Sequence, residues 1–473
     1  MNGLFQQPVR QQGRCARRAS CGALLAGLFF ILPVSAEGPR ETLAPETLPI
    51  IQSIDFVGNR VTRGHILRQE MLVKEGDPAD PSRIEDSRQA IMNLGLFVSV
   101  RVSIKPVEGG VRLTLRVKEK YYILPVPKLN RDLENNFTLG GEISFDNLGG
   151  YNQQLKLRYE TEEGKAVAGG EDVTYLFSYR YPRLFGGPWS LQTELTQDDS
   201  LVDGKLDPED NDPTWLYRKQ SRTAGFQLTH LFAKAGPSDG WQGGGGLIWR
   251  RAVYDYLSTY SSDPPICDPE VPGDCPEPNA FQDSTAVGVR TALSYSKVSD
   301  YLFSRKGVEY GYSGEFGSQM LGSDTTYTRH KFFWRQYYLL DGRPHENIDV
   351  QALVGLSSGD MFLGDKSAYS VGGNSTLRAY ESGTSSGNAY VLLNVQYLRP
   401  FFGYYPLRGV LFLDVGNAYP SNARMHLDTL LWDVGVGVRF RLKSFVKIDL
   451  RVDIAYSPES GESRAYLGTK ELF

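Results

Sequence analysis

Arg378 and Asp414 are the two side chains whose setting most clearly indicates a specific role. Arg378 lies in a glycine-rich segment, residues 369–380, that reads Tyr-Ser-Val-Gly-Gly-Asn-Ser-Thr-Leu-Arg-Ala-Tyr. Asp414 lies in a strand-like run whose alternate residues are apolar, namely Leu411, Leu413 and Val415. Successive side chains of a strand point to opposite faces, so the aspartate is expected on the face opposite these apolar groups. A guanidinium and a carboxylate can form a bidentate ion pair, which is a holding contact and not a catalytic one.

No other group of side chains predicts catalysis. Residues 355–359 and 383–387 match the pattern G-x-S-x-G. That motif needs a strand-to-helix elbow followed by an acid and a histidine, and no helix is expected after either string. The five histidines are scattered, with no H-E-x-x-H and no pair at ligand spacing. We therefore predict a protein that is not an enzyme and that uses neither a metal nor a cofactor.

The start of the chain and its cysteines indicate an exported protein. Residues 1–36 carry several arginines, then an apolar stretch, then Val34-Ser35-Ala36, which is the pattern of a secretory signal peptide. No later run reaches about 18 consecutive apolar residues, so no membrane-spanning helix is expected. Cys267 and Cys275 are the only cysteines beyond this segment. In an oxidising compartment so close a pair predicts a loop-closing disulfide.

Residues 120–473 have the alternating pattern of an all-β transmembrane barrel. Near the C-terminus, Val446, Ile448, Leu450, Val452 and Ile454 alternate with Lys447, Asp449, Arg451 and Asp453. The apolar set is expected to face lipid and the charged set to line the lumen. About sixteen antiparallel strands can be counted, and bacterial barrels have an even number. The long polar connectors 198–219, 253–282 and 358–388 would then all lie at the outer end.

Residues 48–119 predict a small separate domain with the element order β-α-α-β-β. The first helix can start at Thr62. The second has Asp80 as its N-cap and Pro81 at the first helical position, where the missing N–H costs nothing. Two alternating runs, 96–104 and 111–117, flank the turn Glu108-Gly109-Gly110 and predict a hairpin.

Both halves of the chain resemble one family. The loop with Gly372, Gly373, Leu377, Arg378 and Tyr380, and the strand with Phe412, Asp414 and Gly416, resemble motifs of the outer-membrane assembly and secretion superfamily, which includes BamA, TamA and the two-partner-secretion transporters. The resemblance implies that the loop enters the lumen and that its arginine pairs with the strand aspartate. Two residues depart from the family pattern: Ala379 stands where glycine is usual, and Gln396 where glutamate is frequent.

The N-terminal region is similar to a POTRA domain, through F-V-G-N at 56–59, G-D-P at 76–78 and L-G-L-F-V-S-V at 94–100. The resemblance implies that client polypeptides bind by adding a strand to an open sheet edge, for which residues 98–104 are the candidate. A rigid spacer without client contact is the alternative. Phe473 at the C-terminus resembles the signal by which barrel precursors are recognised for insertion.

The resemblance implies an outer-membrane protein of a Gram-negative-type cell, with the POTRA domain in the periplasm. Its function would be to insert or translocate other polypeptides, with periplasmic accessory proteins as further partners. A dedicated exporter of one secreted protein and a passive porin-like channel are the alternatives. In the superfamily the first and last strands form a weak seam, which here would join residues near 121–127 with residues near 464–473. The net charge of −4 gives no basic footprint for nucleic acid.

Overall fold

The computed structural model describes residues 48–131, 137–163, 172–204, 214–232, 239–260, 282–362, 368–446 and 449–468. The chain divides into two units, Met1–Leu48 and Pro49–Phe473. The predicted signal peptide, Cys267, Cys275 and Phe473 lie outside the described residues.

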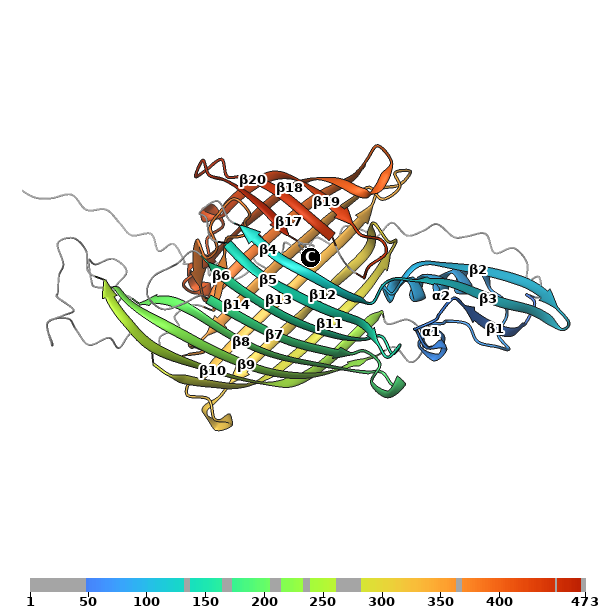
Figure 1. Ribbon diagram of the computed structural model, residues 1–473, viewed down its shortest axis with the longest axis horizontal. Helices are drawn as coiled ribbons and strands as arrows, with labels where there is room; N and C mark the ends of the chain where they lie inside the picture. Colours follow the sequence, from blue (N-terminus) through green and yellow to red (C-terminus); the bar gives the residue numbers. More distant parts are fainter. Residues whose placement is uncertain are drawn as a thin grey trace, which may run out of the picture. The chain divides into compact units, whose positions relative to one another are not determined.

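The N-terminal domain (residues 49–119) has the predicted element order. Its elements are β1 (Ile51–Val57), α1 (Gly64–Gln69), α2 (Pro81–Asn93), β2 (Phe97–Val107) and β3 (Gly110–Glu119). The sheet order is β1-β3-β2, so β2 lies at one end of the sheet. Strand β3 runs parallel to β1 and antiparallel to β2. Figure 1 shows the two helices beside this small sheet.

Local residues explain where the helices begin. Asp80 caps α2, because its carboxylate accepts a 2.8 Å hydrogen bond from the backbone N–H of Ser82. The predicted start of the first helix was wrong by two residues, since α1 begins at Gly64. Thr62 does not act as a cap, because its hydroxyl lies 3.1 Å from the Tyr122 hydroxyl and accepts a 2.9 Å bond from Asn147 Nδ2.

Sixteen antiparallel strands follow in sequence order, as predicted (Figure 1). They are β4 (Ile123–Arg131), β5 (Phe137–Leu148), β6 (Gln153–Glu163), β7 (Asp172–Tyr181), β8 (Trp189–Gly204), β9 (Thr214–Leu231), β10 (Gly240–Tyr260), β11 (Ser284–Asp300), β12 (Arg305–Gly317), β13 (Tyr327–Leu339), β14 (Asn347–Ser358), β17 (Ala389–Phe401), β18 (Tyr404–Tyr419), β19 (Leu431–Arg441), β20 (Asp449–Tyr456) and β21 (Ser463–Gly468). Within the ranges that the structure describes, four short 3-10 helices lie between strands: η1 (Leu184–Gly186), η2 (Gln319–Leu321), η3 (Asn422–Arg424) and η4 (Leu427–Thr429).

Burial separates the two faces of the last strands in the way that the alternation predicts. Leu411, Val436 and Ile454 are 56%, 53% and 54% exposed, whereas Asp414 and Asp453 are fully buried. The apolar face is therefore the outer face, and the charged face is the inner one. One residue was misplaced: Val446 precedes β20 and packs in the core of the N-terminal domain together with Tyr122.

Several strands are longer than a bilayer crossing requires. Residues 198–204 and 214–219 were predicted as loop but continue β8 and β9, and β10 extends to Tyr260. The ladder continues because cross-strand charges compensate one another there, as where Arg218 Nε donates a 2.6 Å bond to Asp199 Oδ1. Among the described residues, none of the helices combines the length and apolarity needed to cross a membrane.

The N-terminal domain contacts the turn between β5 and β6. The backbone N–H of Arg63 donates a 3.1 Å bond to the Gly150 carbonyl, and Arg63 Nε donates one of 3.2 Å to the Gly149 carbonyl. Gly150 has φ +79°, and a Cβ on it would lie 2.2 Å from the Val61 carbonyl oxygen. Only glycine permits this close approach.

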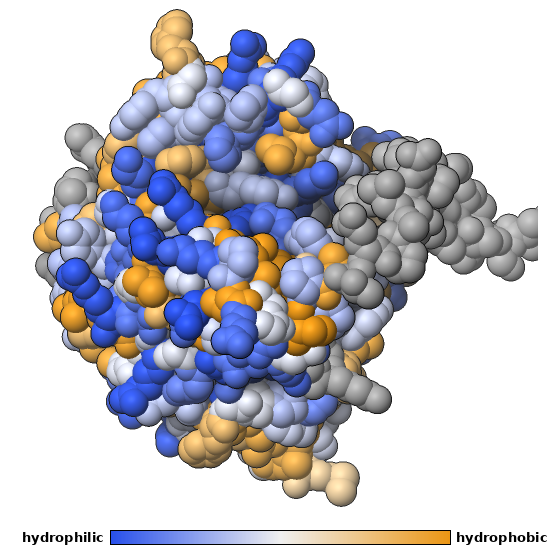
Figure 2. Space-filling view, turned by 90° about the vertical axis from the view of Figure 1, so that its right-hand side faces the viewer, coloured by the Kyte–Doolittle hydropathy of each residue, from blue (hydrophilic) through white to orange (hydrophobic). Residues whose placement is uncertain are grey.

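Hydrophilic residues cover most of the face shown in Figure 2, which indicates contact with water.

Candidate functional site, an arginine loop inside the barrel

A two-stranded ribbon frames the glycine-rich loop between β14 and β17. Its strands are β15 (Tyr369–Val371) and β16 (Ser385–Gly387), with Tyr369 opposite Gly387. The Tyr369 hydroxyl lies 2.9 Å from the His330 carbonyl oxygen and 3.1 Å from that of Leu356. The ribbon is thereby attached to the barrel wall. The loop connects the eleventh and twelfth barrel strands, β14 and β17.

Two glycines make the turn that leads from this ribbon to the arginine. Gly372 and Gly373 have φ of +112° and +87°, and a Cβ on Gly372 would lie 1.8 Å from the Glu381 carbonyl oxygen. The Thr376 hydroxyl accepts a 2.8 Å bond from the Gly372 N–H and donates a 2.7 Å bond to the Gly372 carbonyl. The turn is therefore closed on itself before the chain reaches Arg378.

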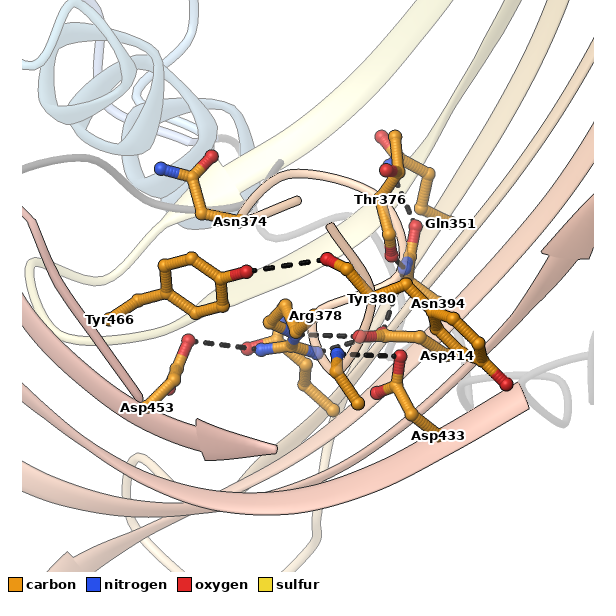
Figure 3. A network of polar contacts seen from close by, with 12 residues as sticks. Gln351, Asn374, Thr376, Arg378, Tyr380, Asn394, Asp414, Asp433, Asp453 and Tyr466 are labelled. Atoms are coloured by element: carbon orange, nitrogen blue, oxygen red, sulfur yellow. Dashed lines mark hydrogen bonds and ion pairs between the residues drawn. The ribbon is translucent and has the colours of Figure 1, made fainter. Parts of the chain in front are cut away.

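Arg378 is fully buried and forms a bidentate pair with Asp414. Its Nε donates a 2.6 Å bond to Asp414 Oδ2, and its Nη2 donates a 2.8 Å bond to Asp414 Oδ1. A third bond, of 3.2 Å, runs from Nη1 to Asp453 Oδ2. Figure 3 shows the guanidinium between these two carboxylates.

An aromatic ring supports the guanidinium from one face. The Arg378 Cζ lies 3.3 Å from the centroid of the Phe412 ring, which is a cation–π contact. The ring has room because Gly435 stands on the neighbouring strand, where a Cβ would lie 2.2 Å from Phe412 Cζ. Glycine is also needed at position 416, because a Cβ there would lie 2.6 Å from the Val391 carbonyl oxygen on the neighbouring strand.

Asp453 joins the loop arginine to two arginines of the wall. Arg439 Nη1 donates a 2.6 Å bond to Asp453 Oδ1, and Arg451 Nε donates a 2.6 Å bond to Asp453 Oδ2. Arg451 also donates to the Asn374 carbonyl at the loop tip. A carboxylate shared by three guanidiniums lies at the centre of this network, so the loop is held by strands β18 to β20 together.

Asn394 and Asp433 complete the surroundings of the loop (Figure 3). Asn394 Nδ2 donates 2.8 Å bonds to the Thr376 carbonyl and to Asp414 Oδ1. The backbone N–H of Ala379 donates a 3.1 Å bond to Asp433 Oδ2. Asp433 lies directly opposite Asp414 on the adjacent strand. Two neighbouring carboxylates therefore bind the loop, Asp414 at the Arg378 side chain and Asp433 at the Ala379 backbone.

The rest of the loop is anchored by apolar and hydroxyl contacts. Leu377 is fully buried and Tyr380 nearly so, and both belong to one apolar cluster with Tyr390, Leu392 and other residues. Ser457 Oγ donates a 2.7 Å bond to the Tyr380 hydroxyl. All five loop residues singled out from the sequence thus lie in or beside this network, and the structure places Phe412, Asp414 and Gly416 against it.

The two departures from the family pattern have local explanations. Ala379 needs no glycine in its place, because its φ is not positive, whereas Gly372, Gly373 and Gly383 of the loop have positive φ. Gln396 interacts with another arginine, since its Oε1 accepts a 3.2 Å bond from Arg439 Nη2. The second carboxylate of Arg378 comes from Asp453, two strands beyond Asp414.

Sequence reasoning missed Asp433, Asp453, Asn394 and Arg439 as parts of this site. Asp453 had been placed on the lumen side of its strand, which was the available signal. Within the described ranges, no group of three or more His, Cys, Asp or Glu side chains is arranged to hold a metal ion. The arrangement holds a loop in place, and it contains no paired nucleophile and base.

Comparison with known proteins assigns both parts of the chain. Residues 147–462 match the Omp85 superfamily domain, and residues 49–120 match the POTRA model described as a surface antigen variable number repeat. The chain is 28% identical over 295 residues to the outer membrane protein assembly factor BamA of Neorickettsia risticii (strain Illinois), a match that covers 60% of this chain and 34% of that protein. The chain thus spans about a third of the length of this relative.

Solved structures share the fold. BamA from Haemophilus ducreyi lacking POTRA domains 1–3 aligns with a TM-score of 0.51 and 16% identity, over 89% of this chain and 84% of that chain. CdiB from Escherichia coli aligns with a TM-score of 0.60 and 14% identity, over 89% and 76%. The fold and the matched domains define an outer-membrane β-barrel with a POTRA domain. The chain belongs to the Omp85 superfamily.

Proposed function

We infer that this protein inserts or translocates other polypeptides at the outer membrane, with the POTRA domain receiving them in the periplasm. The observation that carries this inference is the buried Arg378 network, which anchors a loop inside the barrel. A loop anchored inside the lumen suits a channel that opens only for a client. The domain bounds that go with this proposal are 1–36 for a signal peptide, 48–119 for the POTRA domain and 120–473 for the barrel.

The end strand of the POTRA sheet supports client binding. Strand β2 pairs with β3 on one side only among the described residues, so its other edge offers backbone N–H and C=O groups. Residues 98–104 form the first part of this strand. An extended polypeptide could add to that edge as a further strand. Accessory periplasmic proteins could use the same edge.

The test is deletion of the gene followed by quantitative proteomics of the outer membrane and of the culture supernatant, with the wild-type gene restored as the control. Depletion of many barrel proteins supports assembly work. Loss of one secreted protein with a normal outer membrane supports the dedicated exporter. An unchanged proteome in both fractions contradicts the proposal.

The porin-like alternative requires that the loop leave the lumen open. A passive channel needs an open lumen, whereas here the loop is fastened by Arg378, Leu377 and Tyr380, all buried. High ion conductance in the wild-type protein would favour the porin. The proposed function predicts a low resting conductance.

A further inference from the structure

Strand β4, the first strand of the barrel, carries two prolines on an edge that is not covered by another ladder. In the described part of the chain the strand order runs from β21 to β4, with β4 paired to β5 alone. Pro125 and Pro127 lie within β4. Proline has no N–H, so it is confined to positions whose donor is not needed by a neighbouring strand.

Hydrogen bonds on either side of β4 define the direction of each backbone group. The Tyr122 carbonyl accepts a 2.7 Å bond from the Asp146 N–H, so residue 122 points its backbone groups toward β5. The Tyr121 N–H donates a 2.7 Å bond to the Ser444 carbonyl, so residue 121 points away from β5. Because backbone groups alternate along a strand, the odd-numbered residues of β4 present theirs to the seam.

Both prolines have odd numbers, so the seam edge of β4 lacks donors at two successive positions. Ile123 keeps its N–H, whereas Pro125 and Pro127 offer only carbonyl oxygens there. A strand added to this edge would leave two of its own facing carbonyls without the N–H donors that a ladder supplies. The edge is therefore a poor template for an added strand.

A polar hollow lies just inside this edge. It has a volume of about 670 Å³, and it is lined mainly by side chains of β4 to β8. Glu142, Glu194, Lys156, Arg158 and Arg180 give the lining charges of both signs. The arginine loop is anchored on β18 to β20 and is not among the residues that line the hollow. A surface with both signs of charge suits a hydrated, extended polypeptide.

The hollow begins where the N-terminal domain touches the barrel. Asp146 and Val446 belong to its lining. Asn147, the next residue along the chain, donates its side-chain hydrogen bond to Thr62 of the N-terminal domain. A polypeptide released from that domain would therefore reach the hollow directly, without passing over the seam.

We propose that the hollow lined by β4 to β8 is the surface on which this barrel engages an extended polypeptide, and that Pro125 and Pro127 prevent the seam edge of β4 from templating that polypeptide as an added strand. This inference rests on the proposed function and specifies which surface performs it. Residues 121–127 were expected to form a weak seam with the last strand. Under this proposal they form a strand edge to which a client does not add.

Disulfide trapping on the purified full chain in lipid nanodiscs tests the proposal. The background is Cys267→Ser with Cys275→Ser, and the probe is a synthetic peptide of residues 449–468 that carries Ala465→Cys. Ser178→Cys reports on the hollow, since Ser178 lines it. Ile123→Cys reports on the edge. Tyr175→Cys is the control, because Tyr175 lies on the same strand as Ser178 and is 51% exposed on the outer face.

The expected result is an adduct at Ser178→Cys, with a yield roughly tenfold lower at Ile123→Cys, because two ladder bonds are missing. Adding Pro125→Val and Pro127→Val should raise the Ile123→Cys yield, whereas Leu139→Val with Ile143→Val, at two exposed positions of β5, should not. Equal yields at the edge with and without the prolines would overturn the proposal, as would trapping no better at Ser178→Cys than at Tyr175→Cys. The gene-deletion proteome reports on the proposed function separately, so the two failures can be told apart.

Discussion

At the scale of single residues, the position of the loop depends on the contacts that the buried Arg378 guanidinium makes. The guanidinium is fully buried, with Asp414 and Asp453 as its acceptors and the Phe412 ring beneath it. Removing one partner of a buried pair leaves the other charge without compensation, which is more costly than the pair is stabilising. The loop should therefore respond sharply to changes at this residue and weakly to changes in exposed arginines.

Arg378→Ala is expected to destabilise the barrel by about 3–5 kcal/mol and to free the loop. Thermal unfolding in detergent and limited proteolysis of residues 369–387 measure the two effects. Arg378→Lys keeps the charge but cannot pair in bidentate fashion, so an intermediate loss is expected. Arg399→Ala is the matched control, because the Arg399 side chain is 69% exposed. Equal stability of Arg378→Ala and the control would contradict this account.

Glu119 predicts a pH dependence in the N-terminal domain. Burial raises the pKa of its carboxyl, but hydrogen bonds from Thr62, Val61 and Arg60 outweigh burial and hold the pKa below its ordinary value. A lowered pKa stabilises the folded state above the unfolded value of about 4.3, and this contribution is lost as the pH falls through the folded pKa.

Glu119→Gln should therefore speed amide hydrogen exchange in residues 58–63 at neutral pH. The difference from the wild type should shrink as the pH falls below the ordinary value of about 4.3, and it should vanish once the wild-type carboxyl is protonated at its lowered pKa. Glu108→Gln, on an exposed turn, is the control. A difference that stays constant from neutral to acid pH would show that the charge of Glu119 does not matter.

The pairing of Arg378 with Asp414 could be anticipated because each residue belongs to a local motif that resembles one of the superfamily, and the resemblance implies the pair. Asp453 could not be linked to the same arginine, since it is one of several alternating charges on β20 and its neighbours depend on strand register. Asn394 and Asp433 gave no local signal at all. Their roles arise from cross-strand pairs, Asn394 with Asp414 and Asp414 with Asp433, which only the folded sheet defines.

At the scale of elements, the loop turn depends on glycine at position 372. Gly372→Ala should destabilise the loop by at least about 1–2 kcal/mol, because an L-residue resists positive φ and the new Cβ would meet the Glu381 carbonyl oxygen. Proteolysis of the loop measures the change. Gly141→Ala, where a Cβ would have no neighbour within 4 Å, should leave the rate unaltered. A resistant loop in Gly372→Ala would contradict the assigned turn.

Strand number and type followed from alternation, but strand ends did not. The sequence indicated loops where β8, β9 and β10 continue, because polar and charged residues there resemble connectors. Paired strands can project beyond the bilayer when their backbone groups satisfy one another, and composition does not reveal that pairing. The start of α1 was missed for a related reason, since Thr62 is used by Asn147, a residue far away in the sequence.

At the scale of the whole molecule, the contact between the N-terminal domain and the β5–β6 turn depends on close backbone approach. Gly150→Val should separate residues 147–152 from residues 58–63, since a Cβ would lie 2.2 Å from the Val61 carbonyl oxygen. Faster amide exchange in both segments is the expected readout. Gly64→Ala is the control, because a Cβ there would meet nothing within 4 Å. Unchanged exchange in Gly150→Val would mean that the contact is not maintained in solution.

The central claim is that the loop anchored by Arg378 closes the lumen of a polypeptide-handling barrel. Conductance of single proteins in planar lipid bilayers tests it most directly, with the wild type compared to Arg378→Ala and to deletion of residues 362–387. The account predicts low conductance for the wild type, frequent openings for Arg378→Ala and a large steady conductance for the deletion. High wild-type conductance that neither change alters would contradict it.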